Sequence, residues 1–351
     1  MTGRRVVAAK RTTDQYKHDA TVARLKDTIQ NQKRKNEILL DKSMQLEKKL
    51  AFYEEISSRN PNIHDLTKMK RGGKCTAVLQ LSDWHVEERV DPDTVNDVNS
   101  YNPEIAVKRA RSIFQRSAMM LDVWRGLSKI EDMVIHLGGD FISGYIHEEL
   151  EESNYLSPHE AVELAEDEIV SGIRFLRKEA GIKNLTCISS CGNHGRSTKK
   201  KRVSTYAKNS YEYAMYRRLA KVFKSYLRDP RVQFINTPGY LSWMDIEGHA
   251  CRFHHGDYIN YKGGVGGITI PVNKAIAQWN KTKYAAVDFF GHFHQAVIMN
   301  NWVCNNSLIG YGAYAISIKA EPEEPGQMMS FISPERGKIG SVQIFADSSR
   351  I

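Results

Sequence analysis

The chain has 351 residues, of which 41% are hydrophobic and 26% charged, and its formal net charge is +9 at neutral pH. This length accommodates one large domain with an appendage, and the lack of any run of 18 apolar residues excludes an ordinary transmembrane helix. Five cysteines, an odd number with no C-x-x-C spacing, indicate reduced thiols instead of a disulfide framework. The N-terminal sequence MTGRRVVAAK lacks the apolar core of a signal peptide, so we expect a cytoplasmic protein with no membrane partner.

The first predicted element is a basic helical arm over residues 1–60. Residues 4–60 contain neither glycine nor proline, and a heptad pattern runs through them. Its apolar core positions are Val22, Leu25, Ile29, Leu39, Leu46, Leu50 and Tyr53, and the pattern is interrupted at Gln32, Asn36 and Ser43. The pattern predicts a coiled coil through which the chain self-associates. The alternative is a single long helix that lies on the following domain.

A linker and a single domain are predicted after the arm. Pro61 ends the helix, and the polar residues 61–74, which include Gly72 and Gly73, are typical of a linker to a domain over 75–351. Residues 1–74 hold 18 Lys and Arg against 9 Asp and Glu, whereas the remainder holds 32 of each sign. The net positive charge therefore lies in the arm and linker, where it can attract a polyanion such as nucleic acid. The alternative is a solvated coiled-coil face with surplus lysines.

Five short strings of His, Asp and Asn residues each follow an apolar run that predicts a buried strand. The runs are AVLQLS, MVIHLG, LTCISSC, CRFH and AAVDFF, and the strings are Asp83-Trp84-His85, Gly139-Asp140, Gly192-Asn193-His194, His254-His255-Gly256-Asp257 and Gly291-His292-Phe293-His294. Strand ends in α/β folds hold side chains rigidly beside loops and are a common place for chemistry. Nitrogen and oxygen donors of these types bind Mn²⁺, Fe²⁺ or Zn²⁺, so the sequence predicts a metal centre.

The remaining elements alternate with these strands. Helices are predicted near 103–127, 158–180 and 208–227, and the acidic segment 148–152 is predicted as a helix edge or a loop. The glycine-rich stretch 263–267 lacks the Lys-Ser/Thr ending of a P-loop, so we expect a flexible loop over the substrate instead of a nucleotide cradle. The C-terminal runs SLIGYGAYAISI, MMSFIS and KIGSVQIFA are predicted as strands of a second sheet.

A basic loop follows the third string directly. Its cations are Arg196, Lys199, Lys200, Lys201 and Arg202. A loop of this charge that leaves a strand end at the site is well placed to bind a phosphate backbone. The alternative is a solvated loop with no binding role.

The order D-x-H, G-D, G-N-H, a His before Gly, and G-H-x-H resembles the calcineurin-like metallophosphoesterases, from Lys74 to about Phe345. The resemblance implies an α/β fold, the metallophosphoesterase sandwich of two mixed β-sheets flanked by helices, which here follows the N-terminal helical coiled-coil arm. It also implies two divalent metal ions. The first would bind Asp83, His85, Asp140 and His294, and the second Asp140, Asn193, His255 and His292, so that Asp140 bridges them.

His194 is expected to have a different role from the ligands. The resemblance implies that it faces the substrate as an acid or a transition-state stabiliser, and its near-neutral pKa suits protonation of a leaving alkoxide. The alternative is that His194 only orients Asn193. His254 competes with His255 as a ligand, but the family ligand is the His directly before glycine, and strand alternation points the two rings to opposite faces.

Two departures from the family's subpatterns bear on the substrate. Its protein phosphatases carry G-D-x-x-D-R-G and G-N-H-E, whereas this chain has GDFISG and GNHGR there, so the orienting Asp and the phosphate-binding Arg are absent. The organisation is closer to the SbcD-like DNA repair exonucleases. Those nucleases carry an acidic residue where this chain has Gly195, and little chain follows the fifth string for their DNA-capping domain.

We therefore expect a bimetal-dependent phosphodiesterase that uses a metal-activated hydroxide, with DNA as the expected substrate. Two divalent ions about 3.5–4 Å apart clamp the attacking and leaving oxygens of a phosphoryl displacement. Mn²⁺ is the first expectation, with Fe, Zn, Ni or Mg as alternatives. The other hypotheses are hydrolysis of a small phosphoester, such as a cyclic nucleotide, and a nucleic-acid-associated scaffold with an idle site. The expected partners are nucleic acid and a second copy of the chain.

Overall fold

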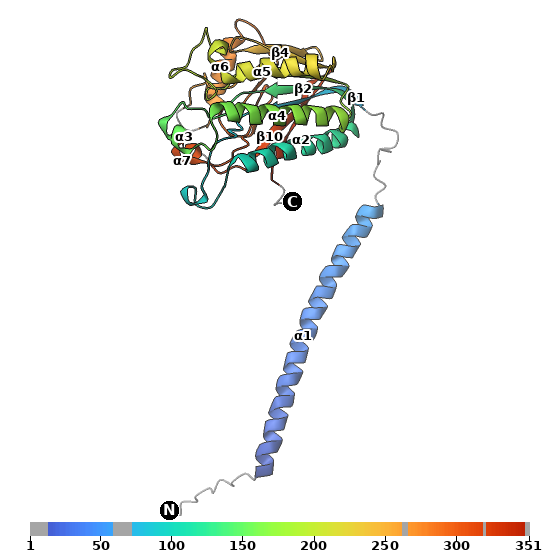
Figure 1. Ribbon diagram of the computed structural model, residues 1–351. Coiled ribbons are helices and arrows are strands. Elements are labelled where there is room, and N and C mark those ends of the chain that lie inside the picture. The colour runs from blue at the N-terminus through green and yellow to red at the C-terminus, as the bar shows by residue number, and fades with distance from the viewer. Residues whose placement is uncertain (1–12, 59–71, 262–265, 319–320, 348–351) are drawn as a thin grey trace, which may run out of the picture. The chain divides into compact units, whose positions relative to one another are not determined.

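The computed structural model describes residues 13–58, 72–261, 266–318 and 321–347. The chain divides into two units, Met1–Lys70 and Arg71–Ile351. The described part of the first unit is one helix, and the second unit contains all the other described helices and strands (Figure 1).

The N-terminal helix α1 (Thr13–Ser58) is 46 residues long. It forms because its sequence contains no glycine or proline and is rich in strong helix formers such as Leu, Lys, Glu and Gln. Its heptad core side chains are exposed: Leu25 by 56%, Leu39 by 63% and Leu46 by 66%. The N-terminal long helix expected from the sequence is therefore present, and residues 1–12 and 59–60 of the predicted arm lie outside the described residues.

Two mixed β-sheets form the centre of the second unit. The six-stranded sheet has the order β11-β10-β1-β2-β3-β4, with β1 (Gly72–Leu81), β2 (Ser128–Leu137), β3 (Asn184–Ser189), β4 (Val232–Asn236), β10 (Gly326–Ser333) and β11 (Gly337–Phe345). The five-stranded sheet has the order β5-β6-β7-β9-β8, with β5 (Ser242–Ile246), β6 (His249–Phe253), β7 (Val287–Phe290), β8 (Val297–Ile298) and β9 (Trp302–Cys304). β1 to β4 run parallel, as do β6, β7 and β9, and antiparallel strands complete both sheets.

Three of the helices of the second unit begin at polar capping residues. The helices of this unit are α2 (Pro103–Arg125), α3 (Glu148–Ser153), α4 (Pro158–Lys178), α5 (Tyr211–Lys221), α6 (Thr269–Trp279) and α7 (Ala313–Ile318), with short turns at η2 (Pro92–Thr94), η3 (Ala207–Asn209) and the π-helical η4 (Val222–Tyr226). The side chains of Asn102, Ser157 and Ser210 accept backbone N–H groups of α2, α4 and α5. None of the helices in the described part of the chain is both long and apolar enough to cross a membrane.

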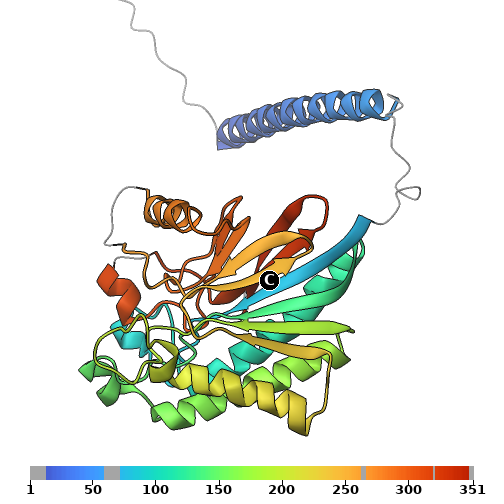
Figure 2. The ribbon, with the colours of Figure 1, turned by 90° about the horizontal axis from the view of Figure 1, so that it is seen from above.

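The elements stack in four layers, helix on sheet on sheet on helix. In β1, Ala77 and Leu79 join the core beneath α2, α4 and α5, whereas Val78 joins the core between the two sheets. α6 covers the outer face of the five-stranded sheet, where Val272 packs near Trp302. Figure 2 shows α4 and α5 below the six-stranded sheet and the five-stranded sheet above it.

Three sequence expectations need correction. MMSFIS and KIGSVQIFA form β10 and β11, but these pair with β1 in the same sheet as β2 and β3, not in a second sheet. The run SLIGYGAYAISI forms a loop and the helix α7 instead of a strand. β1 begins at Gly72, so Gly72 to Lys74 belong to a strand and not to the linker expected over 61–74. Gly72 N–H donates to Leu127 O, which pairs this end of the strand.

Candidate metal centre

The five strings lie together at one edge of the two sheets. β1, β2 and β3 are parallel neighbours, and so are β6 and β7, so the carboxyl ends of each group meet at one edge. Loops after these ends bring together all of the expected ligands: Asp83, His85, Asp140, Asn193, His255, His292 and His294. The fold thus brings to one place donors that lie up to about 200 residues apart in the sequence.

Two clusters of potential ligands can be distinguished by their donor atoms. Asp83, His85 and His294 offer donors that all lie within 4.8 Å of one another, and so do Asp140, His255 and His292. In the first cluster, His294 Nε2 lies 3.3 Å from His85 Nε2 and 3.5 Å from Asp83 Oδ1. In the second, His255 Nε2 lies 2.9 Å from Asp140 Oδ2.

The backbone at the clusters is held in an uncommon conformation. Asp83, His85, Asp140, His292 and His294 all have φ between +49° and +72°, a region that only a few per cent of non-glycine residues adopt, with Asn, Asp and His more frequent there than other types. Each such residue costs on the order of 1–3 kcal/mol and persists where the surrounding structure enforces it, typically at functional sites. Five of the nine non-glycine residues with positive φ in the described part of the chain lie at the two clusters, which makes this edge the candidate functional site.

Glycines allow the second and third strings to touch. Gly139 has φ of +88°, and a Cβ there would overlap Gly192 N and lie 2.6 Å from Gly192 Cα. A Cβ on Gly192 would in turn overlap Asp140 N and its carboxylate. Side chains are therefore excluded at both glycines, and His194 N–H reaches Asp140 Oδ1 at 2.7 Å.

Hydrogen bonds orient the side chains of the first cluster. Ser143 Oγ donates to Glu88 Oε2 at 2.6 Å, so its oxygen is available to accept His85 Nδ1–H at 2.8 Å. This tautomer directs the lone pair of His85 Nε2 toward the cluster. His292 N–H lies 3.1 Å from both oxygens of Asp83 and fixes that carboxylate.

The second cluster is oriented in the same manner. His255 Nδ1 lies 2.8 Å from Gly138 O, which accepts its proton and leaves Nε2 facing Asp140. His254 points the other way, stacks on Phe290 and lies 3.5 Å from Asp288 Oδ1 through its Nε2. Of the two adjacent histidines, His255 is therefore the one at the cluster.

The donor set fits divalent cations. Asn193 Oδ1 is buried and has no hydrogen-bond partner among the described residues, although an unpaired buried polar atom costs about 1–3 kcal/mol. A cation bound by this oxygen would remove that cost. Imidazole, carboxylate and amide donors together suit first-row transition metals.

Buried charges interact strongly at the site. Burial acts to raise the pKa of Asp140, but the imidazoles of His255 and His194 hold it well below its usual range. Burial lowers the pKa of His85 and His292, which favours their neutral, ligating form. Burial also opposes protonation of His255, but the negative field of Asp140 dominates and raises its pKa to about 10. The same field attracts a cation.

His194 lies beside the clusters without belonging to either. Its Nδ1 lies 3.1 Å from Ser143 O, and its ring centroid is 4.8 Å from that of His85. Burial lowers the pKa of His194 despite the nearby Asp140 carboxylate. With Nδ1 bonded to a carbonyl, Nε2 is the nitrogen available to a molecule in the cleft.

A cleft of about 710 Å³ opens over the clusters. Its metal-centre residues are His85, Asp140, Asn193, His194, His292 and His294. Its other charged lining residues are Glu88, Arg89, Asp91, Glu149 and Glu152, and apolar residues of α3 and α7 complete the wall. Apart from the metal ligands, the cleft is therefore more acidic than basic.

The basic loop does not line this cleft. Arg196, Lys201 and Arg202 line a small neighbouring hollow that also contains Asn193. Arg196 binds the carbonyl oxygens of Asn193 and Thr198, and Lys201 Nζ lies 3.0 Å from the buried Asp257 carboxylate. These two cations hold the loop in place. Lys199, Lys200 and Arg202 are exposed, so the cations available to a ligand lie beside the metal centre.

Two buried carboxylates at the site were missed by the sequence reasoning. Glu87 accepts the N–H groups of Ser143 and Gly144 at 2.8 Å each, and Glu212 accepts those of Phe141 and Gly192 at 2.7 Å each. Burial raises the pKa of both carboxyls to about 8. No sequence signal separates Glu87 from a solvated glutamate. No local pattern identifies Glu212 either, because it reaches Gly192 from 20 residues further along the chain.

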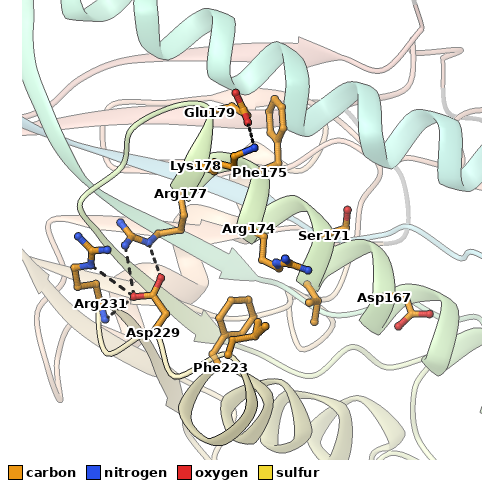
Figure 3. A pocket seen from close by; sticks show the side chains of 12 residues that line it. Asp167, Ser171, Arg174, Phe175, Arg177, Lys178, Glu179, Phe223, Asp229 and Arg231 are labelled. Atoms are coloured by element: carbon orange, nitrogen blue, oxygen red, sulfur yellow. Dashed lines mark hydrogen bonds and ion pairs between the residues drawn. The ribbon is translucent and has the colours of Figure 1, made fainter.

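A second hollow lies between α4 and the segment from η4 to β4 and has a volume of about 730 Å³ (Figure 3). Phe175 and Phe223 contribute its apolar lining. Among its charged side chains, Asp229 lies 3.1 Å from Arg177 and 3.6 Å from Arg231. It contains none of the expected site residues, so the metal centre remains the candidate functional site.

The sequence matches no protein-family model and no curated protein. Solved structures with a similar chain trace include a single mutant of Vps29 from Entamoeba histolytica, with 12% identity, coverage of 76% of this chain and 98% of the other, and a TM-score of 0.33. A hypothetical protein from Pyrococcus horikoshii has 15% identity, coverage of 78% and 89%, and a TM-score of 0.36. A predicted phosphoesterase from Streptococcus pneumoniae has 10% identity, coverage of 77% and 98%, and a TM-score of 0.27. At these values the likeness is distant, and the chemistry of the site rests on its own side chains.

Proposed function

We propose that this protein is a metal-dependent phosphoester hydrolase of the calcineurin-like type. The observation that carries the proposal is the pair of buried His and Asp clusters beneath one cleft. Imidazole and carboxylate donors in two adjacent groups suit two divalent cations. A close pair of such cations is the usual device for in-line displacement at phosphorus.

Each residue of the site has a role in this proposal. One ion would bind Asp83, His85 and His294, the other Asn193, His255 and His292, and Asp140 would serve both. When bound, the ions would supply Lewis acidity that lowers the pKa of water and neutralises phosphoryl oxygens. The residues around them orient the donors and exclude water. We assign His194 to proton donation at the leaving oxygen through Nε2, because its Nδ1 is bonded to Ser143 O.

Mn²⁺ is the ion that we propose first. The mixture of imidazole nitrogens with carboxylate and amide oxygens is compatible with Mn²⁺, and Fe, Zn, Ni and Mg ions are the alternatives to be tested. Activity recovered by each ion after removal of metals with a chelator would identify the functional metal.

For the substrate we propose a nucleic-acid phosphodiester, cleaved as in an SbcD-like DNA nuclease. The support is the basic loop, which carries the exposed Lys199, Lys200 and Arg202 and whose Arg202 lines the same hollow as Asn193. Such cations bind phosphates and release counterions. A small phosphoester is the second candidate, because the acidic lining of the cleft disfavours a polyanion there.

One assay tests the function and separates the two substrates. Purified protein with Mn²⁺ is given bis-p-nitrophenyl phosphate, single-stranded DNA, duplex DNA and a cyclic nucleotide. We expect hydrolysis of the chromogenic diester and of DNA, abolished by a chelator and restored by Mn²⁺. Hydrolysis of the small esters alone would favour the second candidate. No metal-dependent hydrolysis of any of them would contradict the proposed function and leave the scaffold hypothesis.

We also propose that α1 pairs with α1 of a second copy of the chain. Its heptad positions carry exposed leucines, including Leu25, Leu39 and Leu46. Apolar residues repeating every 3.5 positions favour a two-stranded coiled coil, and the polar Asn36 at a core position is typical of register control.

A further inference from the structure

Glu212 is a buried carboxylate that joins two loops of the metal centre. It lies in the first turn of α5 and its side chain is fully buried. Oε1 accepts the N–H of Phe141, and Oε2 accepts the N–H of Gly192, both at 2.7 Å. Phe141 directly follows Asp140, and Gly192 directly precedes Asn193. One carboxylate therefore binds the backbone beside two proposed ligands.

Only glycine at position 195 leaves room for this carboxylate. A Cβ on Gly195 would lie 2.7 Å from Cγ, 2.8 Å from Cδ and 3.0 Å from Oε2 of Glu212, and these are its three nearest atoms. The φ of Gly195 is outside the left-handed range, so backbone conformation does not require glycine there. Glycine is required at position 195 because the Glu212 side chain occupies the adjacent space.

The start of α5 is fixed on the third string. Tyr211 N–H donates to Gly195 O at 2.8 Å, and Arg196 forms a β-bridge with Ser210. The basic loop therefore begins and ends at the bridge between Arg196 and Ser210. Ser210 caps the helix by accepting Tyr213 N–H, which fixes the first turn that carries Glu212.

We propose that Glu212 is the positioning residue of the second metal cluster. Its carboxylate sets the spacing of the Asp140 and Asn193 loops, and so sets the affinity of the cluster that also contains His255. Glu212 takes the place of the acidic side chain that Gly195 lacks, and it acts through backbone amides instead of touching the donor atoms. The inference rests on the proposed metal-dependent function. The first cluster of Asp83, His85 and His294 is not joined by Glu212.

The test is a Mn²⁺ titration of Glu212→Gln by calorimetry, with hydrolysis of bis-p-nitrophenyl phosphate measured beside it. An amide keeps one acceptor and turns its NH₂ group toward the other backbone N–H. We expect the binding step of the second cluster to weaken by about 10- to 100-fold, the range for residues that support metal ligands, whereas the step of the first cluster, which shares only Asp140, weakens less, and kcat falls. The matched control is Glu168→Gln, which should leave both steps unchanged, because Glu168 is a buried carboxylate of α4 that is bound by Arg111 of α2.

A second pair of variants tests the exchange between positions 212 and 195. Gly195→Ala should weaken the same binding step, because its Cβ displaces the Glu212 carboxylate. In a Glu212→Ala background, Gly195→Glu should restore that step by returning a carboxylate to the vacated space. If Glu212→Gln does not fold, Gly195→Ala provides the same test.

The outcomes separate this inference from the proposed function. Wild-type protein that binds no Mn²⁺ contradicts the proposed function itself. Wild-type protein with two binding steps that both survive Glu212→Gln contradicts the inference alone. Equal weakening of both steps, together with a lowered unfolding temperature, means that Glu212 only stabilises the fold.

Discussion

At the scale of residues, the metal centre contains some residues with a strained backbone and another with a buried donor that has no partner. Asp140 and His292 hold left-handed φ values, and Asn193 Oδ1 is buried without a hydrogen-bond partner among the described residues. Each of these features costs on the order of 1–3 kcal/mol. A cation bound at Asn193 Oδ1 would satisfy that donor and offset its share of the cost.

The role of His194 can be separated from that of the ligands. His194→Ala should keep metal affinity near the wild-type value and slow turnover by roughly 10²–10⁴, because a positioned acid is lost. The loss should shrink for esters with good leaving groups such as p-nitrophenolate, which need little protonation. Rates across a series of leaving groups, with calorimetric metal binding, provide the measurement.

The control for this variant is His147→Ala, since His147 lines the same cleft with its ring 6.1 Å from that of His194. It should leave the leaving-group dependence unchanged. If metal occupancy of His194→Ala falls in step with its activity, His194 is a ligand or an orienting group and not the acid.

The contact between Gly139 and Gly192 should be visible in stability. Gly139→Ala introduces a Cβ that overlaps Gly192, whereas Gly181→Ala introduces one with nothing within 4 Å. Both glycines have positive φ, so both variants carry a conformational cost of about 1–2 kcal/mol. Gly139→Ala should lose at least about 2 kcal/mol more, as overpacked sites do. Urea unfolding measures both, and equal losses would contradict the proposed contact.

At the scale of residues, the sequence predicts those features that depend on short local patterns. The five strings could be found because each is a short pattern after an apolar run. Strand alternation implies that only one of His254 and His255 can be a ligand, and the resemblance to the family favoured His255, which directly precedes glycine. Glu212 could not be found in that way, because it reaches Gly192 across the loop that separates them in sequence. Burial of a carboxylate by distant residues leaves no local pattern.

At the scale of elements, the basic loop can be tested apart from the metals. On duplex DNA, each phosphate contact contributes about −0.9 to the slope of log affinity against log salt concentration. If the exposed cations of the loop bind DNA, Lys199→Ala with Lys200→Ala should reduce the magnitude of this slope by up to about 2. Hydrolysis of a small chromogenic diester should barely change. The measurement is DNA affinity as a function of salt.

Lys201 is left intact in that experiment, because its bond to Asp257 holds the loop. The matched control is Lys221→Ala with Lys224→Ala, which removes two exposed cations at the far end of α5 and in η4. An unchanged salt slope in the loop variant would favour the small phosphoester as substrate.

Elements were predicted better than their pairing. The helices α2, α4 and α5 were expected because their apolar periodicity and capping residues are local. The sequence did not predict that β10 and β11 belong to the same sheet as β1, because this pairing joins segments about 250 residues apart. The segment that forms α7 is a short apolar run, and such runs do not distinguish helix from strand.

For the whole molecule, α1 should control association without controlling chemistry. Removal of residues 1–60 should abolish self-association and reduce DNA affinity, because it removes the heptads and most of the surplus positive charge. Hydrolysis of bis-p-nitrophenyl phosphate should be unaffected. Sedimentation equilibrium and DNA titration measure the two effects.

A control for association keeps the charge of the arm. Leu39→Asn with Leu46→Asn places amides at two core positions of the heptad and should weaken association without changing net charge. A wild-type protein that is monomeric at high concentration would contradict the pairing of α1.

The most direct test of the two-metal centre is the number of Mn²⁺ ions bound by wild-type protein and by Asp140→Asn, measured by calorimetry and elemental analysis beside hydrolysis of bis-p-nitrophenyl phosphate. We predict two ions per chain and hydrolysis in the wild type. Asp140→Asn should lose at least one ion and all measurable activity, because a neutral amide cannot offset two dications, while its circular dichroism spectrum stays native. An Asp140→Asn variant that keeps both ions and wild-type hydrolysis would contradict the account.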